Sequence, residues 1–287
     1  MRGGGADPLA YRAFVTDIDG TLLGINGGIA PRDVAAIREL ERRGIPVTLC
    51  TGRMYSGTRA IAMELGLCEP VACIDGSHIV DSGTHRELAT APLPPEALAT
   101  LCRLLERTGP TVFAFAGDRL YYDANGQPYL PYLATWSEDT VEVETVLDPD
   151  RFGYEEKVAA LVALGTEDQI ASAHEALREH HGTLLQAACF ALQRPEDGGL
   201  WGMIARAARV DKGTALEWLA AHYGITLDEI VAVGDWVNDI PMLERAGCSF
   251  AMGQAPDSVK AAADHVLSAD AWTGGGIAEA AERAGLL

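Results

Sequence analysis

Short apolar runs alternate with amphipathic segments at the start of this chain, and this alternation constrains the fold more than any other feature. Apolar strands are predicted at Tyr11–Thr16, Ile45–Cys50 and Val71–Ile74, with helices between them at about Pro31–Arg43 and Tyr55–Leu65. Strands that are continuously apolar are typical of a parallel sheet with both faces covered by helices. The sequence therefore predicts an α/β fold built on a doubly wound, mostly parallel sheet.

The alternation stops in the middle of the chain and resumes near its end. Between residues 83 and 205, helix and strand patterns follow one another in a mixed order that is typical of an α+β domain. The strand–helix order returns with a helix at Lys212–Tyr223, for which Asp211 is a suitable N-cap. We therefore expect a discontinuous core domain, residues 1–82 and 206–287, interrupted by an inserted domain of residues 83–205.

Polar residues come directly after three strands of the predicted core. Asp17 and Asp19 follow the first strand, Thr51 follows the second, and Asp235 follows an apolar run at Ile230–Val233. Because the carboxyl ends of parallel strands meet at one edge of a sheet, and ligands bind there, these residues are expected to converge. The sequence thus predicts one functional site built from distant segments.

The acidic residues of this predicted site require a cation. Asp17, Asp19, Asp235 and Asp239 would bring up to four carboxylates together, and carboxylates this close cannot all stay ionised without positive charge. The ligands are all oxygens, with no His or Cys among them, so a hard ion such as Mg²⁺ fits better than Zn²⁺. Since protein-bound Mg²⁺ is usually shared with phosphate oxygens, we expect a phosphate-bearing substrate.

Lys212 is the obvious positive charge near these acids. The chain contains only three lysines, Lys157, Lys212 and Lys260, and otherwise uses arginine. A cation in the first turn of a helix opposes the helix dipole, at a cost of about 0.3–1 kcal/mol. Such a charge is easier to understand if it faces a carboxylate or a phosphate than if it is a solvated surface lysine, which is the alternative.

Several other chemistries and partners are excluded. The sequence contains no G-x-x-x-x-G-K-[ST] phosphate loop, no G-x-G-x-x-G after a strand and no G-x-S-x-G elbow, and an EF-hand beginning at Asp17 would need Glu where Gly28 stands. A net charge of −19 argues against nucleic-acid binding. No run of about 18 apolar residues predicts a membrane span, and six cysteines without a C-x-x-C pair suggest reduced thiols in a cytoplasmic protein.

Four segments, in order, resemble the motifs of the haloacid dehalogenase superfamily. They are Asp17-Ile18-Asp19-Gly20-Thr21-Leu22-Leu23, Thr51-Gly52-Arg53, Lys212-Gly213 and Gly234-Asp235-Trp236-Val237-Asn238-Asp239. The long insertion between the second and third motifs resembles the type IIB cap of the Cof-like phosphatases. The resemblance covers nearly the whole chain after residue 10, and it implies a Rossmann-like core with a cap domain that selects the substrate.

The resemblance also implies a role for each matched residue. Asp17 would be the nucleophile that forms an aspartyl-phosphate, and Asp19 would protonate the leaving alcohol and then activate water. The Mg²⁺ ligands would be Asp17, the backbone carbonyl of Asp19, and Asp235. The phosphate-binding residues would be Thr51, Gly52, Lys212 and Asn238, with Thr21, Arg53 and Asp239 in supporting positions.

The sequence therefore predicts a Mg²⁺-dependent phosphatase, that is, a phosphoric monoester hydrolase acting on a small phosphorylated metabolite. A sugar phosphate is the commonest substrate in similar proteins, and a monomer or homodimer is expected. One alternative is a phosphomutase of the phosphomannomutase type, whose members carry a similar cap. Another is a non-catalytic sensor of a phosphorylated ligand, although the intact set of Asp17, Asp19, Lys212 and Asp235 counts against it.

Two positions depart from the pattern of the family. Asp75 stands in an Asp-Gly-Ser segment where relatives often carry Asn-Gly-Ala, and a tight turn is favoured over a changed metal or substrate contact. Trp236 stands where smaller residues are commoner, so it either packs under the cap or lines the substrate pocket. His78 and His85 lie near the predicted cap hinge and could contact the substrate.

Overall fold

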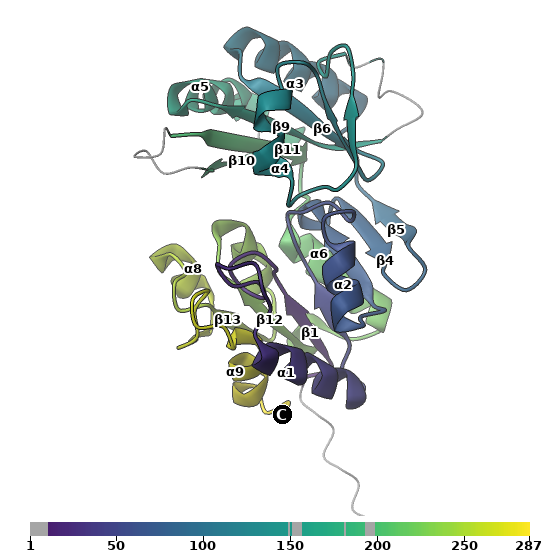
Figure 1. Ribbon diagram of the computed structural model, residues 1–287, viewed down its shortest axis with the longest axis vertical. Helices are drawn as coiled ribbons and strands as arrows, with labels where there is room; N and C mark the ends of the chain where they lie inside the picture. The colour runs from purple at the N-terminus through teal and green to yellow at the C-terminus, as the bar shows by residue number, and fades with distance from the viewer. Residues whose placement is uncertain (1–10, 149, 151–156, 181, 193–198) are drawn as a thin grey trace, which may run out of the picture. The chain divides into compact units, whose positions relative to one another are not determined.

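The computed structural model describes residues 11–148, 150, 157–180, 182–192 and 199–287 (Figure 1). The chain divides into two compact units, which interleave along the sequence. The first unit comprises Met1–Thr51, Glu64–Val71 and Asp211–Leu287, and the second comprises Gly52–Met63 and Ala72–Val210. The core and cap boundaries given above stay a prediction, and residues 52–63 and 72–82 of the predicted core lie in the second unit.

The first unit is built on a five-stranded sheet in which all neighbouring strands are parallel. Its order is β14-β13-β12-β1-β2, with bounds β1 Ala13–Thr16, β2 Val47–Leu49, β12 Ile230–Gly234, β13 Cys248–Ala251 and β14 His265–Val266. The chain proceeds from β1 to β2 on one side and from β12 to β13 on the other. The topological switch point, where ligands of such sheets bind, therefore lies between β1 and β12.

Buried strands and amphipathic helices explain why this unit folds. Every residue of β1, β2, β12 and β13 is buried, as expected for a sheet covered on both faces. The helices are α1 Pro31–Arg42, α6 Lys212–Tyr223, α7 Ile240–Leu243, α8 Asp257–Ala262 and α9 Gly276–Arg283. Helix α1 packs on α9, and the carboxylate of Asp33 accepts hydrogen bonds from the Gly275 and Ala278 amides at the start of α9.

The second unit contains a six-stranded sheet in the order β10-β11-β9-β6-β7-β8. The bounds are β6 Thr111–Ala116, β7 Arg119–Tyr122, β8 Thr140–Glu142, β9 Val158–Gly165, β10 Leu185–Ala191 and β11 Trp201–Ala207. All pairs are antiparallel except β7 with β8. Helices α3 Pro95–Thr108 and α5 Glu167–Leu177 pack on each other and on this sheet (Figure 1). Short helical segments are α4 Leu130–Leu133, η2 Gln127–Tyr129 and η3 Arg178–His180.

The third predicted strand pairs differently from expectation. Strand β3 Pro70–Cys73 joins the hairpin of β4 His78–Asp81 and β5 Arg86–Thr90, rather than the five-stranded sheet. Between β3 and β4, Ile74 and Asp75 both have φ of 50°, a left-handed conformation that turns the chain back within the 3₁₀ segment η1 Ile74–Gly76. Helix α2 Arg59–Leu65 precedes β3.

The α/β fold class is confirmed, because a parallel sheet is accompanied by antiparallel sheets of the kind expected for a cap. None of the helices within the described residues is both long and apolar enough to span a bilayer. All six cysteines are free thiols.

Candidate functional site

Asp17 is the first residue beyond β1, at the switch point of the sheet. Its backbone amide donates to the Val233 carbonyl of β12 at 3.0 Å, which fixes Asp17 between the two central strands. Its side chain is 8% exposed. A carboxylate in this position is almost removed from water, and it therefore depends on neighbouring groups for its charge state.

Lys212 supplies the neighbouring positive charge. It begins α6 directly after Asp211, whose side chain caps the helix by accepting from the Thr214 amide. The Nζ atom of Lys212 donates to Asp17 Oδ1 at 2.5 Å and to Asp239 Oδ1 at 2.6 Å, and the side chain is 0% exposed. Lys212 is thus a buried partner of two carboxylates and not a solvated surface lysine.

Asp239 is buried, and its carboxylate holds the loop after β12 in place. Its Oδ2 accepts from the backbone amides of Asp235 at 2.8 Å and Trp236 at 2.9 Å, while its Oδ1 faces Lys212. Any side chain at Gly234 would run into the Asp239 carboxylate, which explains the glycine that ends β12. Both oxygens of Asp239 are therefore committed to donors of the protein.

Asp235 lies beside the loop that follows β1. Its Oδ1 accepts from the Thr21 hydroxyl at 3.1 Å. Gly20 has φ of 81°, and a side chain there would meet the Asp235 carboxylate. Two residues of the first motif therefore support Asp235: Gly20 leaves space for its carboxylate, and the Thr21 hydroxyl orients it.

The three carboxylates Asp17, Asp235 and Asp239 each offer an oxygen within 4.8 Å of the others. Burial raises the pKa of Asp17 well above its ordinary value, with Lys212 opposing the shift and Asp239 and Asp235 adding to it. Burial and the charge of Asp239 raise the pKa of Asp235 to about 7, although hydrogen bonds from Gln254 and Thr21 lower it. Burial opposes protonation of Lys212, but Asp17 and Asp239 outweigh it and hold its pKa above the ordinary value.

The excess of buried negative charge in this cluster suits a divalent cation. Three carboxylates share one lysine, so an additional cation would lower the cost of keeping them ionised. The donor set is made of oxygens, as Mg²⁺ prefers. Asp239 already accepts from Lys212 and from two backbone amides, whereas each oxygen of Asp235 accepts from one neutral donor. Asp17 and Asp235 are therefore the carboxylates better placed to hold the ion.

The other predicted site residues occupy different surroundings. Asp19 is exposed, two residues beyond Asp17, and forms an isolated bridge with Leu23. Thr51 is buried and follows β2, where the Cys50 amide donates to the Thr16 carbonyl of β1 at 2.9 Å. Asn238 is half-buried in the 3₁₀ segment η6 Val237–Asp239.

Gly52 and Arg53 belong to the second unit. Arg53 is buried, and its guanidinium donates to the Gly57 carbonyl at 3.1 Å. The structure therefore brings together Asp17, Thr21, Lys212, Asp235 and Asp239 within the first unit, whereas the proposed phosphate contact of Gly52 and the supporting role of Arg53 stay predictions.

One residue of this cluster, Gln254, was not predicted from the sequence. Its amide donates to Asp235 Oδ2 at 3.1 Å. It lies three residues beyond the end of β13, and thus also follows a strand of the parallel sheet. That position is the signal that could have identified it, but an uncharged Gln in a loop does not stand out among polar loop residues.

The two departures from the family pattern are now placed. Asp75 is buried in the turn before β4 and forms an ion pair with Arg206 on β11, both within the second unit. This arrangement favours the tight-turn interpretation, with the carboxylate compensated by an arginine. Trp236 is 47% exposed.

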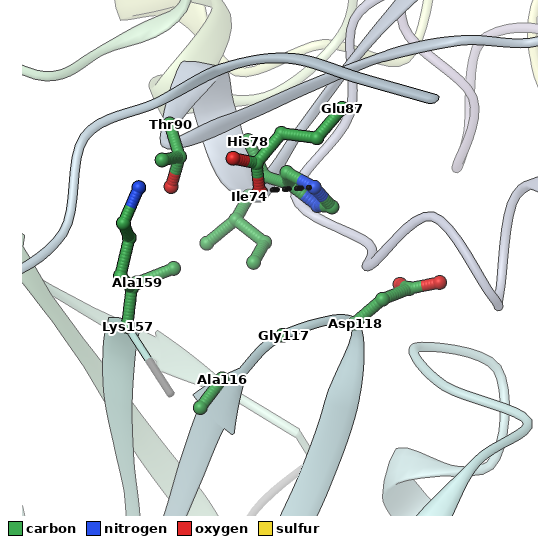
Figure 2. A pocket seen from close by; sticks show the side chains of 9 residues that line it. All are labelled: Ile74, His78, Glu87, Thr90, Ala116, Gly117, Asp118, Lys157 and Ala159. Atoms are coloured by element: carbon green, nitrogen blue, oxygen red, sulfur yellow. Dashed lines mark ion pairs between the residues drawn. The ribbon is translucent and has the colours of Figure 1, made fainter. Parts of the chain in front are cut away.

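The second unit has a cavity of about 230 Å³ between the β4–β5 hairpin and the six-stranded sheet. Figure 2 shows Lys157 and Thr90 at one side of it and His78 with Glu87 at another. His78 Nε2 lies 3.4 Å from Glu87, and burial lowers the pKa of the His78 imidazole. His85 Nδ1 lies 2.6 Å from the Tyr55 hydroxyl. Both histidines thus have partners inside this unit.

Comparisons with known proteins agree with this geometry. A family model described as haloacid dehalogenase-like hydrolase matches residues 14–280. The chain is 30% identical over 272 residues to the phosphoglycolate phosphatase of Methanopyrus kandleri, a match covering 92% of this chain and 93% of the relative. It is 26% identical over 267 residues to the pyridoxal phosphate phosphatase YbhA of Escherichia coli, covering 90% and 94%. The solved structure of the subclass IIB sugar phosphatase BT4131 shares the fold, with a TM-score of 0.75 and 20% identity over 96% of this chain and 100% of that one.

Proposed function

Because this chain belongs to the haloacid dehalogenase-like hydrolase family, we propose that the Asp17 cluster is the active centre of a Mg²⁺-dependent phosphatase that hydrolyses a small phosphorylated metabolite. The family prediction is confirmed, and the enzyme is a phosphoric monoester hydrolase, as its named relatives are phosphatases. The observation that carries the proposal is the buried Lys212 held between Asp17 and Asp239, with Asp235 at the same site.

In the first half of the reaction, an oxygen of Asp17 attacks phosphorus in line with the ester bond. A P–O bond forms to Asp17 while the P–O bond to the leaving alcohol breaks, and Asp19 donates its proton to that alcohol. Lys212 contacts Asp17, so its positive charge favours the ionised nucleophile and offsets charge on the phosphoryl oxygens. Asp19 is exposed, as suits a group that must meet both substrate and water.

In the second half, water attacks the phosphorus of the aspartyl-phosphate. Asp19, now ionised, takes the proton from water, the bond between phosphorus and Asp17 breaks, and inorganic phosphate leaves. The same acid thus serves both steps and returns to its protonated state.

Asp17, Asp235 and the backbone carbonyl of Asp19 would hold the Mg²⁺, which would supply positive charge to the phosphate oxygens. Asp239 would not be a ligand, because Lys212 and two backbone amides occupy its oxygens. The proposed phosphate contacts are Thr51, Gly52, Lys212 and Asn238, with Thr21 and Arg53 in support.

We further propose a sugar phosphate as the substrate, with residues 83–205 as the cap that selects it. The relatives named for phosphoglycolate and pyridoxal phosphate show that the substrate differs among similar chains. A cytoplasmic location and a monomeric or homodimeric state complete the proposal.

The test is phosphate release from p-nitrophenyl phosphate and from a panel of sugar phosphates in the presence of Mg²⁺. Asp17→Asn should abolish release, and Asp19→Asn should lower it strongly. Asp228→Asn, an equivalent change at an exposed aspartate, should leave the rate unchanged. Circular dichroism would establish that each variant is folded.

Three results would contradict the proposal. Wild-type turnover by folded Asp17→Asn would exclude Asp17 as the nucleophile. Turnover that requires a bisphosphate activator would indicate the mutase. Tight binding of a phosphorylated ligand without phosphate release, with any divalent metal, would indicate the sensor.

A further inference from the structure

Gln254 is a half-buried residue that links Asp235 to two other loops of the first unit. Its Nε2 donates to the Gly20 carbonyl at 2.7 Å and to Asp235 Oδ2 at 3.1 Å, and its Oε1 accepts from the Ala271 amide at 3.1 Å. We propose that Gln254 is a positioning residue that holds the Asp235 carboxylate for Mg²⁺. This inference rests on the proposed function, since it takes Asp235 as a metal ligand.

The contacts of Gln254 allow only one orientation of its amide. The nitrogen faces two acceptors, the Gly20 carbonyl and the Asp235 carboxylate, and the oxygen faces the Ala271 N–H donor. A flipped amide would place oxygen against two acceptors and nitrogen against a donor. All three interactions therefore reinforce one orientation, and the side chain is a rigid support.

Asp235 is held differently from the other two acids. Lys212 contacts Asp17 and Asp239, whereas the Asp235 oxygens accept from neutral donors: Thr21 at Oδ1 and Gln254 at Oδ2. Neutral donors orient a carboxylate without cancelling its charge, and each oxygen retains a further lone pair. Asp235 is thus an oriented carboxylate whose hydrogen-bond donors are neutral, so neither of these contacts pairs it with a positive charge of the protein.

Loss of a hydrogen bond to a metal-ligating group typically lowers the affinity for the metal by about 10-fold to 100-fold. Gln254 also makes the orientation of Asp235 depend on the loop before α9, through Ala271. That loop has a second, independent anchor, because Glu279 accepts from the Ser268 and Ala269 amides. The two anchors can therefore be removed separately.

The experiment measures Mg²⁺ binding by titration calorimetry, in the absence of substrate, on the full chain. Gln254→Met keeps the length of the side chain but removes its donors and acceptor, and should raise the Mg²⁺ dissociation constant about 10-fold to 100-fold. Gln254→Asn is one methylene shorter and cannot span Asp235 and Ala271, so it should also weaken binding. Glu279→Ala removes the other loop anchor and should change the dissociation constant less than twofold.

Two further readouts separate positioning from a general structural defect. The rise in melting temperature that Mg²⁺ produces should be smaller for Gln254→Met than for wild type at equal Mg²⁺. In phosphatase assays, Gln254→Met should need more Mg²⁺ for half-maximal rate and should approach the wild-type kcat at saturating Mg²⁺.

Each contrary outcome has its own meaning. If the wild type binds Mg²⁺ and folded Gln254→Met binds it within twofold, the positioning role is wrong while the proposed function stands. If Glu279→Ala weakens binding as much as Gln254→Met, the loop and not Gln254 orients Asp235, and the inference is overturned. If the wild type binds no Mg²⁺, the metal chemistry of the proposed function fails, and the inference with it.

Discussion

Replacing Lys212 with methionine should destabilise the first unit strongly, even without substrate. The side chain is 0% exposed and neutralises Asp17 and Asp239, whose side chains are 8% and 0% exposed. Removing one partner of a buried ion pair leaves an uncompensated charge and costs about 3–5 kcal/mol. Since the pKa of Asp17 is already raised by burial, this carboxyl can take up a proton in the variant, so we expect the lower end of that range.

The assay is urea denaturation followed by circular dichroism, with Lys260→Met on α8 as the matched control. The control should lie within about 0.5 kcal/mol of wild type, as is usual for surface substitutions. The double variant Lys212→Met/Asp17→Asn should regain part of the loss, because the uncompensated carboxylate is gone.

The destabilisation should depend on pH in a defined direction. Without Lys212, the pKa of Asp17 in the folded state rises further above its pKa in the unfolded state. Between these two pKa values the folded state binds more protons than the unfolded state, so the stability of the variant falls as pH increases. The deficit relative to wild type should therefore be smaller at pH 5 than at pH 8. A Lys212→Met variant as stable as wild type at pH 8, or one whose deficit grows on acidification, would refute this account of the cluster.

Two other substitutions test the surroundings of the site and the second unit. Gly20→Ala should lose about 1–3 kcal/mol of stability and most phosphatase activity, because residue 20 has φ of 81° and the new methyl group would meet the Asp235 carboxylate. Activity equal to wild type in the p-nitrophenyl phosphate assay would contradict this close approach. Burial lowers the pKa of His78 in the folded state below its unfolded value of about 6.5. The unfolded state therefore binds more protons, and stability should fall as pH drops below that value. His78→Gln should flatten this part of the stability–pH curve, and an unchanged slope would exclude His78 as the source of the pH dependence.

The sequence predicted those parts of the fold that repeat a local pattern. The continuous apolar runs that became β1, β2 and β12 carry their own signal, because burial on both faces leaves no polar position. The helix at Lys212–Tyr223 was predicted with its bounds from the N-cap Asp211, and in the structure the left-handed Gly224 ends it. The position of Asp17 and Asp235 beside one another then follows from the parallel sheet.

The parts that were not predicted depend on contacts distant in sequence. Strand β3 has the same apolar character as β1, and its pairing with β4 depends on the left-handed conformation of Ile74, which a β-branched residue rarely adopts. Strand β8 has three residues, and it exists because β7 offers it a parallel partner. Gln254 is recognisable only once Gly20, Asp235 and Ala271 are known to surround it.

The distinction between Asp235 and Asp239 shows what residue identity alone does not determine. Both are aspartates after the same strand, and both are buried. Asp239 lies at the end of a 3₁₀ turn, so its carboxylate folds back onto the amides of Asp235 and Trp236, and Gly234 leaves room for it. The backbone amides thereby orient this carboxylate, and Lys212, which also contacts Asp17, supplies the positive charge beside it.

Within the part of the chain that the structure describes, the Asp235 side chain instead accepts from neutral donors in the loops that follow β1 and β13. These donors orient the carboxylate without pairing it with a cation of the protein, as suits the metal ligand that we propose. Within one cluster of identical side chains, the surrounding donors therefore distinguish the carboxylates: Lys212 contacts Asp17 and Asp239, backbone amides hold Asp239 against the loop, and Thr21 and Gln254 orient Asp235. This division supports the roles that we propose, with Asp17 as nucleophile and with Asp17 and Asp235 as metal ligands.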